Sequence, residues 1–334
     1  MQRLIDRYRG LVCDLDGVVY RGALAVSHAV EVLEALEQPV VYATNNASRT
    51  PADVVEHLRS LGLSVSGEDV ATSSTAAATV LARTLPAGTA VLAVGGEGVR
   101  VALAAVGLAP VAPGEFREGR PVRAVVQGYG PEVTAADLGE AAYAVQGGAR
   151  WVATNVDATL PTDRGQAPGN GSLVGAVRNA VDVDPEVMGK PHPPMYVIAA
   201  EHLGLAPAEV LAVGDRLETD IAGAVAAGTG GALVLTGVHD WVDAAAAPRA
   251  RRPDHVIADL RGLLEPYPDH RDDGGWSVRG AAAARVGDEG VEIRGDGQDV
   301  LRAALDALWA AADEGGVDPA WCRGEIARLA ERLR

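Results

Sequence analysis

Residues 11–20 read LVCDLDGVVY, and the predicted fold and candidate site both start from this segment. An apolar run typical of a buried strand carries Asp14 and Asp16 at alternate positions and then breaks at Gly17, where the chain can turn. Asp14 belongs to the last pleat of the strand, and Asp16 on the bending chain can swing toward the same point. Two close carboxylates repel each other unless a cation lies between them or one of them holds a proton. Taken alone, such a pair is more often a solvated acidic turn. Whether this pair is functional therefore depends on the motifs in the rest of the chain.

Apolar strands alternate with amphipathic helices after this turn. Residues 29–36 have helical spacing, and residues 39–44 form a short β-branched run that ends in two asparagines. Thr50 is the expected N-cap of a further helix, Pro51 its first residue, and Gly62 its end. This alternation predicts an α/β fold with a doubly wound, Rossmann-like parallel sheet. In such sheets the chemistry gathers beyond the carboxyl ends of the strands.

The chain divides into three predicted regions. Residues 1–88 and 185–264 are expected to form a catalytic core. Residues 89–184 are expected to form a smaller inserted α/β domain, because the sequence pattern changes near residue 89. Residues 265–334 form a C-terminal α+β extension, which carries no chemical motif and is expected to be a docking or oligomerisation appendage. Within the extension we expect a linker at 266–275, a short strand at 291–294, and helices at 300–311 and 321–333.

Polar residues follow four of the predicted parallel strands. They are Asp14 with Asp16, Thr44 with Asn45, Lys190, and Asp215 with Asp220. Each group alone has an ordinary explanation, such as a capping turn, a structural ion pair or a solvated loop. Their convergence on one crevice favours a phosphoryl-transfer site, because that reaction depends on charge stabilisation and positioning.

Each residue type suits a part of that reaction. Carboxylates from two strand ends can hold Mg²⁺, which prefers oxygen ligands. Lys190 supplies a positive charge for phosphate oxygens, and the Thr44 hydroxyl with nearby backbone N–H groups can bind the others. A carboxylate can attack phosphorus and form an aspartyl-phosphate, while a second Asp protonates the leaving alkoxide and later activates water.

The motifs DLDGVV, TNN, GKP and GDRLETD, in this order, resemble those of the haloacid dehalogenase superfamily. The insert, with ATNVDATLP and PGNGSLVGAV, resembles the large α/β C2-type cap of class IIA, which includes NagD-type, pyridoxal, phosphoglycolate and glycerol-3-phosphate phosphatases. The resemblance covers roughly residues 8 to 262, and the longer chain resembles an extended form in actinobacterial enzymes.

The resemblance also implies roles for individual residues. It makes Asp14 the nucleophile and Asp16 the general acid and base. Mg²⁺ would bind the Asp14 carboxylate, the Asp16 backbone carbonyl and Asp215, with Asp220 supporting the metal site. The phosphoryl group would be held by Thr44, Asn45 and Lys190.

Composition limits the classes of molecule that this protein is expected to bind. Forty-five acidic residues against 29 Lys and Arg leave a net charge of −16, which argues against nucleic acid or an anionic membrane. Cys13 and Cys322 form no disulfide or zinc framework, and neither a secretory signal nor a membrane-spanning run is evident. We therefore expect a cytoplasmic protein that acts on a small phosphorylated metabolite, and we leave open whether it forms a homo-oligomer.

The resulting prediction is a Mg²⁺-dependent phosphomonoesterase, with glycerol 3-phosphate as the leading substrate. The alternatives are 2-phosphoglycolate, pyridoxal 5′-phosphate, and a nucleoside or sugar phosphate. Two other classes stay open: a phosphate-sensing or partner-binding module that acts through the extension, and a phosphomutase. Specificity is expected from the cap, where Thr154, Asn155 and Asp157 either approach the substrate or the seam between cap and core, or form a helix-capping turn. Cap closure is expected to exclude water.

Overall fold

The computed structural model describes residues 2–162 and 164–333. The chain divides into two compact units. Unit 1 comprises the residues up to Pro39 together with those from Leu205 onward, and unit 2 comprises Val40–Gly204. The boundaries expected for core, cap and extension remain predictions.

Unit 1 contains a sheet of parallel strands in the order β15-β14-β13-β1. These strands are β1 (Gly10–Asp14), β13 (Val210–Gly214), β14 (Gly230–Val234) and β15 (His255–Ile257). The first two pair in register, with Cys13 opposite Val213, so their carboxyl ends lie together. The predicted parallel α/β arrangement is confirmed, and it places the residues after β1 and after β13 at one edge of the sheet.

Short elements complete this part of unit 1. A small hairpin, β2 (Tyr20–Arg21) and β3 (Leu24–Ala25), follows the acidic turn. The helices are α1 (Ala29–Glu34), α9 (Ala222–Ala227) and α10 (Trp241–Ala245), and a π-helical turn, η4, spans Leu217–Ile221. Four 3₁₀ turns are η1 (Ile5–Arg7), η3 (Pro207–Glu209), η5 (Arg249–Arg251) and η6 (Leu260–Leu263).

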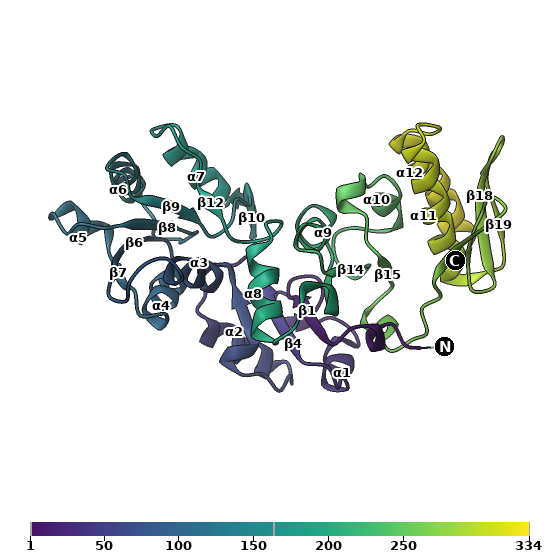
Figure 1. The fold of residues 1–334 in the computed structure, drawn as a ribbon, viewed down its shortest axis with the longest axis horizontal. Helices are drawn as coiled ribbons and strands as arrows, with labels where there is room; N and C mark the ends of the chain where they lie inside the picture. The colour runs from purple at the N-terminus through teal and green to yellow at the C-terminus, as the bar shows by residue number, and fades with distance from the viewer. Residues whose placement is uncertain (1, 163, 334) are drawn as a thin grey trace. The chain divides into compact units, whose positions relative to one another are not determined.

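The C-terminal extension is an antiparallel sheet covered by two helices. Its strands, in spatial order, are β16 (His270–Asp273), β17 (Trp276–Arg279), β18 (Ala282–Gly287) and β19 (Gly290–Arg294). The helices α11 (Gly297–Asp313) and α12 (Pro319–Arg332) lie along this sheet in Figure 1. The expected strand and both expected helices are confirmed, whereas β16, β17 and β18 were missed.

One hydrophobic cluster joins the extension to the parallel-sheet part of unit 1. Ile221 and Leu233 belong to it together with Leu305, Leu308 and Ile326 of the two C-terminal helices, and each of these side chains is at most 1% exposed. Burial of that extent makes the extension part of the same packed core.

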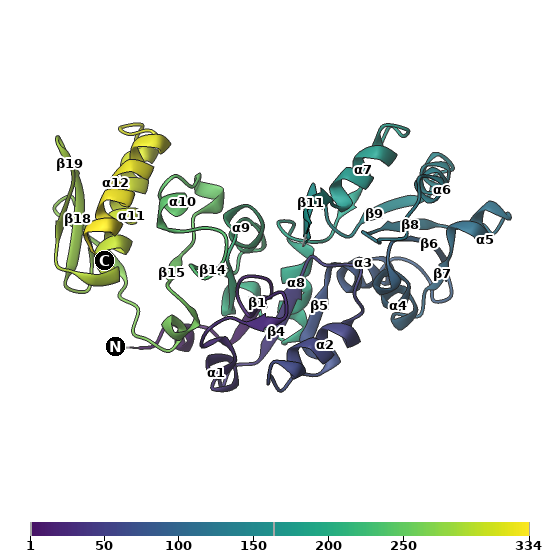
Figure 2. The same cartoon turned by 180° about the vertical axis from the view of Figure 1, so that it is seen from behind.

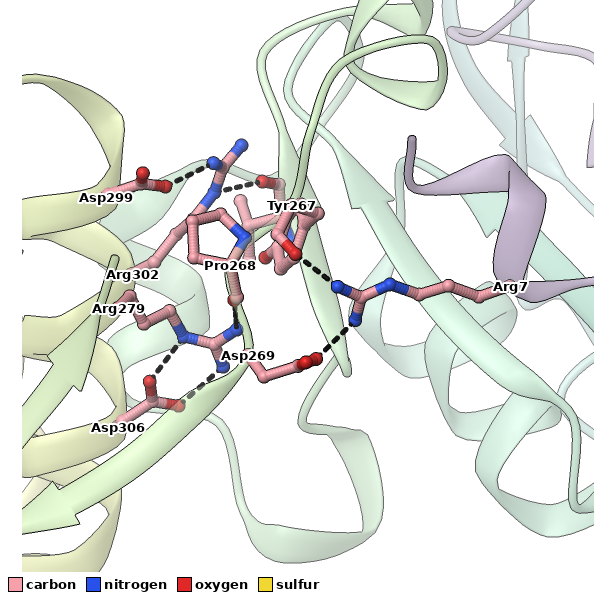
Figure 3. Close-up of polar contacts among 9 residues, drawn as sticks. Arg7, Tyr267, Pro268, Asp269, Arg279, Asp299, Arg302 and Asp306 are labelled. Atoms are coloured by element: carbon pink, nitrogen blue, oxygen red, sulfur yellow. Dashed lines mark hydrogen bonds and ion pairs between the residues drawn. The ribbon is translucent and has the colours of Figure 1, made fainter. Parts of the chain in front are cut away.

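The linker expected at residues 266–275 is wrong. Tyr267 is only 3% exposed, and its backbone carbonyl accepts a hydrogen bond from Arg7. Arg279 donates to Pro268 O at 3.1 Å and forms a bidentate ion pair with Asp306, as Figure 3 shows. The prolines and acidic residues that suggest a flexible linker in the sequence thus belong to an ordered junction with buried arginines.

Unit 2 begins with the parallel strands β4 (Val40–Thr44) and β5 (Val70–Thr72). Helix α2 (Pro51–Ser60) starts at a capping box, in which Thr50 and Asp53 bond each other's backbone N–H groups, and it buries Val54, Val55 and Leu58. This part also contains α3 (Ser73–Ala82), α8 (Pro194–His202) and the 3₁₀ turn η2 (Gly67–Asp69).

The inserted part of unit 2 is a second parallel sheet, in the order β12-β9-β8-β6-β7. Figure 2 shows helices α6 and α7 on one side of β6, β8 and β9, and α4 on the other. The strands are β6 (Ala90–Val94), β7 (Ala109–Val111), β8 (Ala124–Gln127), β9 (Arg150–Ala153) and β12 (Glu186–Val187). The helices are α4 (Glu97–Ala105), α5 (Pro113–Arg117), α6 (Ala135–Gln146) and α7 (Asn170–Arg178), and a hairpin pairs β10 (Thr159–Thr162) with β11 (Gly165–Pro168). The expected α/β insert is thus present.

Within residues 2–162 and 164–333, no helix combines the length and apolar character needed to cross a membrane.

Candidate active site

Three carboxylates of unit 1 come together at the carboxyl edge of its parallel sheet. Asp14 is the last residue of β1, Asp215 follows β13 directly, and Asp220 lies in η4. One oxygen from each carboxylate lies within 4.8 Å of the other two. Asp215 and Asp220 are each 2% exposed.

Asp215 sits in a close-fitting cradle. Its Oδ2 accepts a hydrogen bond from Val238 N at 2.8 Å. A Cβ added at Gly17 would lie 2.5 Å from this oxygen, and one at Gly237 would lie 1.9 Å from it, so a side chain at either position would collide with the carboxylate. Gly17 also has φ of +88°, a conformation that L-residues with a side chain rarely adopt. Both glycines are therefore needed for the carboxylate to lie where it does.

Asp220 is held by the turn that carries it. Its Oδ2 accepts a hydrogen bond from Arg216 N at 3.0 Å, and its own backbone N–H donates to Arg216 O at 2.9 Å. A Cβ at Gly214 would lie 2.1 Å from the Asp220 Cβ, so the end of β13 has to be glycine for η4 to fold back this closely.

The three carboxylates fit a hard divalent cation. Three negative charges within 4.8 Å of one another repel strongly in a mostly buried setting, and a cation between them offsets that repulsion. Their donor atoms are all oxygens, the ligand type that Mg²⁺ prefers. Asp14, Asp215 and Asp220 are therefore the residues of this chain that would hold Mg²⁺.

Asp16 lies on the turn after β1, next to this group. The residue is exposed, and its backbone forms an isolated bridge with Tyr20. The turn is anchored by Leu15, which is fully buried, and by Thr236, whose hydroxyl donates to Gly17 O at 2.7 Å. Asp16 is thus presented at the surface by an anchored turn.

The predicted phosphate-binding residues lie in unit 2. Thr44 is the last residue of β4 and is 5% exposed, and its Oγ1 accepts a hydrogen bond from Asn46 N at 3.1 Å. Lys190 is 3% exposed, and its Nζ donates to Ala43 O at 3.4 Å. A buried ammonium group beside a strand end is well placed to meet an anion.

Asn45 ties the Thr44 and Lys190 segments together. Its Oδ1 accepts from Lys190 N at 2.8 Å, and its Nδ2 donates to Lys190 O at 3.0 Å. The same Nδ2 lies 3.1 Å from an oxygen of Asp157. The Asn45 carbonyl accepts from Ser73 Oγ and from Asn155 Nδ2, both at 2.8 Å. The side-chain amide of Asn45 is therefore engaged with the Lys190 backbone and with the Asp157 carboxylate.

Thr154, Asn155 and Asp157, expected near the substrate, at the seam between cap and core or in a helix-capping turn, follow β9, and these expected roles stay predictions. Asn155 and Asp157 contact Asn45, as described above, and Asn155 Oδ1 also accepts from Asp157 N at 3.1 Å, which is a local turn. Thr154 is fully buried. The sequence alone did not identify Ser73, Gly237 or His239. For Gly237 the available signal is the Thr236–Gly237 pair, which interrupts the apolar run after β14.

Comparisons with known proteins agree with this geometry. The haloacid dehalogenase-like hydrolase family matches residues 11–109, and a related hydrolase family of the same superfamily matches residues 187–263. The D-glycerol 3-phosphate phosphatase of Mycobacterium tuberculosis is 43% identical over 320 residues, which cover 93% of this chain and 88% of that protein. The chain belongs to the haloacid dehalogenase-like hydrolases.

Other members of the superfamily define how far the likeness extends. An acid sugar phosphatase of Staphylococcus aureus is 35% identical over 242 residues, 72% of this chain and 91% of that protein. The crystal structure of the M. tuberculosis glycerol phosphate phosphatase in complex with magnesium has a TM-score of 0.82 and 42% identity, and the match covers 93% of both chains. The predictions of the superfamily, of a class IIA phosphatase, of the α/β fold with its inserted cap sheet, and of magnesium as the cofactor are confirmed.

Proposed function

We propose that this phosphatase hydrolyses glycerol 3-phosphate, using Mg²⁺ and an aspartyl-phosphate intermediate. The observation that carries the proposal is the buried group of Asp14, Asp215 and Asp220 at the carboxyl edge of a parallel sheet. The choice of glycerol 3-phosphate is supported by the 43% identity to a phosphatase of that name, because the match includes most of the C-terminal extension.

The first step transfers the phosphoryl group to the enzyme. A carboxylate oxygen of Asp14 attacks phosphorus, and the bond between phosphorus and the glycerol oxygen breaks. The electron pair leaves with that oxygen, which takes a proton from the carboxylic acid of Asp16. Glycerol is released, Asp14 carries the phosphoryl group, and Asp16 is left as a carboxylate.

The second step returns the enzyme to its starting state. Asp16 removes a proton from a water molecule, whose oxygen attacks phosphorus, and the bond between phosphorus and Asp14 breaks. Inorganic phosphate leaves, and Asp16 is again protonated. Thr44, the backbone N–H of Asn45 and Lys190 bind the phosphoryl oxygens in both steps. When bound, Mg²⁺ neutralises negative charge that accumulates on those oxygens.

We also propose that the enzyme works in the cytoplasm on a small, freely diffusing ester. Cys13 and Cys322 are buried, and within the described part of the chain neither forms a disulfide, which fits a reducing compartment. The charge of −16 means that an anionic substrate has to be attracted by a local cation such as Lys190.

The test is phosphate release with Mg²⁺ from four esters: glycerol 3-phosphate, 2-phosphoglycolate, pyridoxal 5′-phosphate and a sugar phosphate. It is run beside Asp14→Asn and, as a matched control, Asp182→Asn, which changes an exposed aspartate of unit 2. We expect glycerol 3-phosphate to give the highest kcat/KM, Asp14→Asn to be inactive, and the control to match the wild type. A higher kcat/KM for another ester would overturn the substrate. Activity that survives in Asp14→Asn would overturn the mechanism.

A further inference from the structure

His239 follows β14 in sequence and contacts the segment that comes after β13. Its backbone N–H donates to Asp215 O at 3.2 Å. Its Nδ1 accepts a hydrogen bond from Leu217 N at 3.0 Å, and its Nε2 lies 3.4 Å from an oxygen of Glu218. One residue therefore contacts the metal-ligand residue Asp215 and the start of the turn that carries Asp220.

The side-chain contact solves a problem that the local sequence leaves open. The first N–H groups of a helical turn have no partner within the turn, and they need one when they are buried. Leu217 begins η4 and is 6% exposed, and no side chain of the preceding residue caps the turn. The imidazole of His239, from a segment 22 residues further along the chain, provides the acceptor.

The contact also defines the state of the ring. Because Nδ1 accepts the Leu217 N–H, the ring proton lies on Nε2, where it faces Glu218. The His239 side chain is 19% exposed, so the ring is largely enclosed. Its position is further restricted by its neighbour in sequence, since Val238 donates its N–H to Asp215 Oδ2 at 2.8 Å.

We propose that His239 is a positioning residue for the metal site, which holds Asp215 and the Asp220 turn in the arrangement that binds a divalent cation. The inference deepens the proposed function and rests on its metal site. His239 touches neither substrate nor cation in this role. It acts by fixing the distance between the Asp215 backbone and the Leu217 N–H, and so the spacing of the two carboxylates.

Three substitutions separate this role from simple loss of bulk. In His239→Asn the side-chain Oδ1 is the same number of bonds from Cα as Nδ1, so it can accept the Leu217 N–H. In His239→Gln the amide group corresponds instead to Nε2, and in His239→Ala the acceptor is absent. His202→Ala, at the end of α8 in unit 2, is the matched control for losing a surface histidine.

The measurement is Mn²⁺ binding to the full chain after bound metal has been removed. The concentration of free Mn²⁺ is monitored by its electron paramagnetic resonance signal. We expect His239→Asn to bind within about threefold of the wild type, and the Ala and Gln variants to bind about 10- to 100-fold more weakly, the range typical of residues that orient metal ligands. The His202→Ala control should bind as the wild type does.

Equal Mn²⁺ affinity in all the His239 variants, or tighter binding by Gln than by Asn, would overturn the inference and leave the proposed function intact. Absence of Mn²⁺ binding by the wild type would overturn the metal site and the inference together. Amide hydrogen exchange of the wild type gives a test that needs no variant to fold. The Leu217 amide should be strongly protected, and exchange as fast as that of an exposed amide would refute the hydrogen bond to His239.

Discussion

Asp220→Asn should make the metal-free protein more stable and the metal-loaded protein no better than the wild type. At 4.8 Å, the upper limit on the separations within the group, two full charges repel by about 3.5 kcal/mol at an effective dielectric constant of about 20. Neutralising Asp220 removes two of the three pairwise repulsions among Asp14, Asp215 and Asp220. The amide oxygen can still accept the Arg216 N–H, so the turn keeps its hydrogen bond.

The net gain is smaller than the sum of the repulsions, because neighbouring donors lose a charged acceptor when Asp220 is neutralised. Single stabilising substitutions commonly add about 0.5–2 kcal/mol, and we expect about 2 kcal/mol here. In domains of about 150–250 residues, that corresponds to a rise in Tm of about 4–8 °C. Mg²⁺ at about 100 times its Kd should stabilise the wild type by about 2.7 kcal/mol and the variant by much less.

Thermal unfolding of both proteins, in EDTA and in Mg²⁺, measures this directly. The variant should have the higher Tm in EDTA, and the difference should vanish or reverse in Mg²⁺. If Asp220→Asn lowers Tm in EDTA, the three carboxylates are already balanced by other groups, and the electrostatic reasoning is refuted. If Mg²⁺ stabilises both proteins equally, Asp220 is not part of the metal site.

Three further predictions follow from the site and the packing. Asp16→Asn should lower kcat about 10²- to 10⁴-fold while Mn²⁺ binding persists, since general acid catalysis contributes about that much; unchanged kcat would exclude Asp16 as the acid. Leu308→Ala, at a fully buried position, should lower the free energy of unfolding in urea by about 3 kcal/mol, against less than about 0.5 kcal/mol for Leu24→Ala, which is 75% exposed. Burial, with the nearby arginine charges, lowers the pKa of His255 to about 3. Since the unfolded chain binds this proton below about pH 6.5, stability should fall by about 2.7 kcal/mol between about pH 7 and pH 4.5 in the wild type. His255→Gln should lose that part of the pH dependence, and an identical pH profile would contradict the assignment.

The parallel-sheet fold could be predicted because its signals are local. Buried strands of four or five apolar residues end at glycine or acid, and amphipathic helices begin at recognisable caps such as Thr50 with Asp53. The same local signals gave a wrong prediction at the start of the extension, where a linker was expected. Tyr267 and Arg279 are ordered by contacts with Arg7 and Asp306, which lie far away in sequence. Prolines and acids beside such contacts look like a linker when the partners are unknown.

The acidic residues of the site could also be predicted, since each follows a strand whose end the pattern defines. The supporting residues could not. Val238 and His239 donate backbone hydrogen bonds to Asp215 from more than 20 residues away, and the His239 ring accepts one from Leu217 N. No motif spacing encodes these contacts. Similarly, the sequence does not reveal that the Asn45 side chain bonds both the backbone N–H and the backbone carbonyl of Lys190.

The extension contacts α10, the helix that follows His239. Helix α10 begins directly after His239 and Asp240, and the extension holds it through Trp309 Nε1, which donates to Ala244 O at 2.9 Å, and through an ion pair of Arg323 with Asp243.

Arg279, which fixes the start of the extension, is kept charged. Burial alone would lower the pKa of its guanidinium, but the hydrogen bonds and charge of Asp306 raise it above the usual value. Figure 3 shows the two hydrogen bonds of this pair. A separable partner-binding module would leave the core intact when removed. Removing this extension would instead expose Leu233 and Ile221 and release α10, so a truncated chain that loses activity says nothing about a lost partner. Point substitutions on the outer surface of the extension are the informative way to look for one.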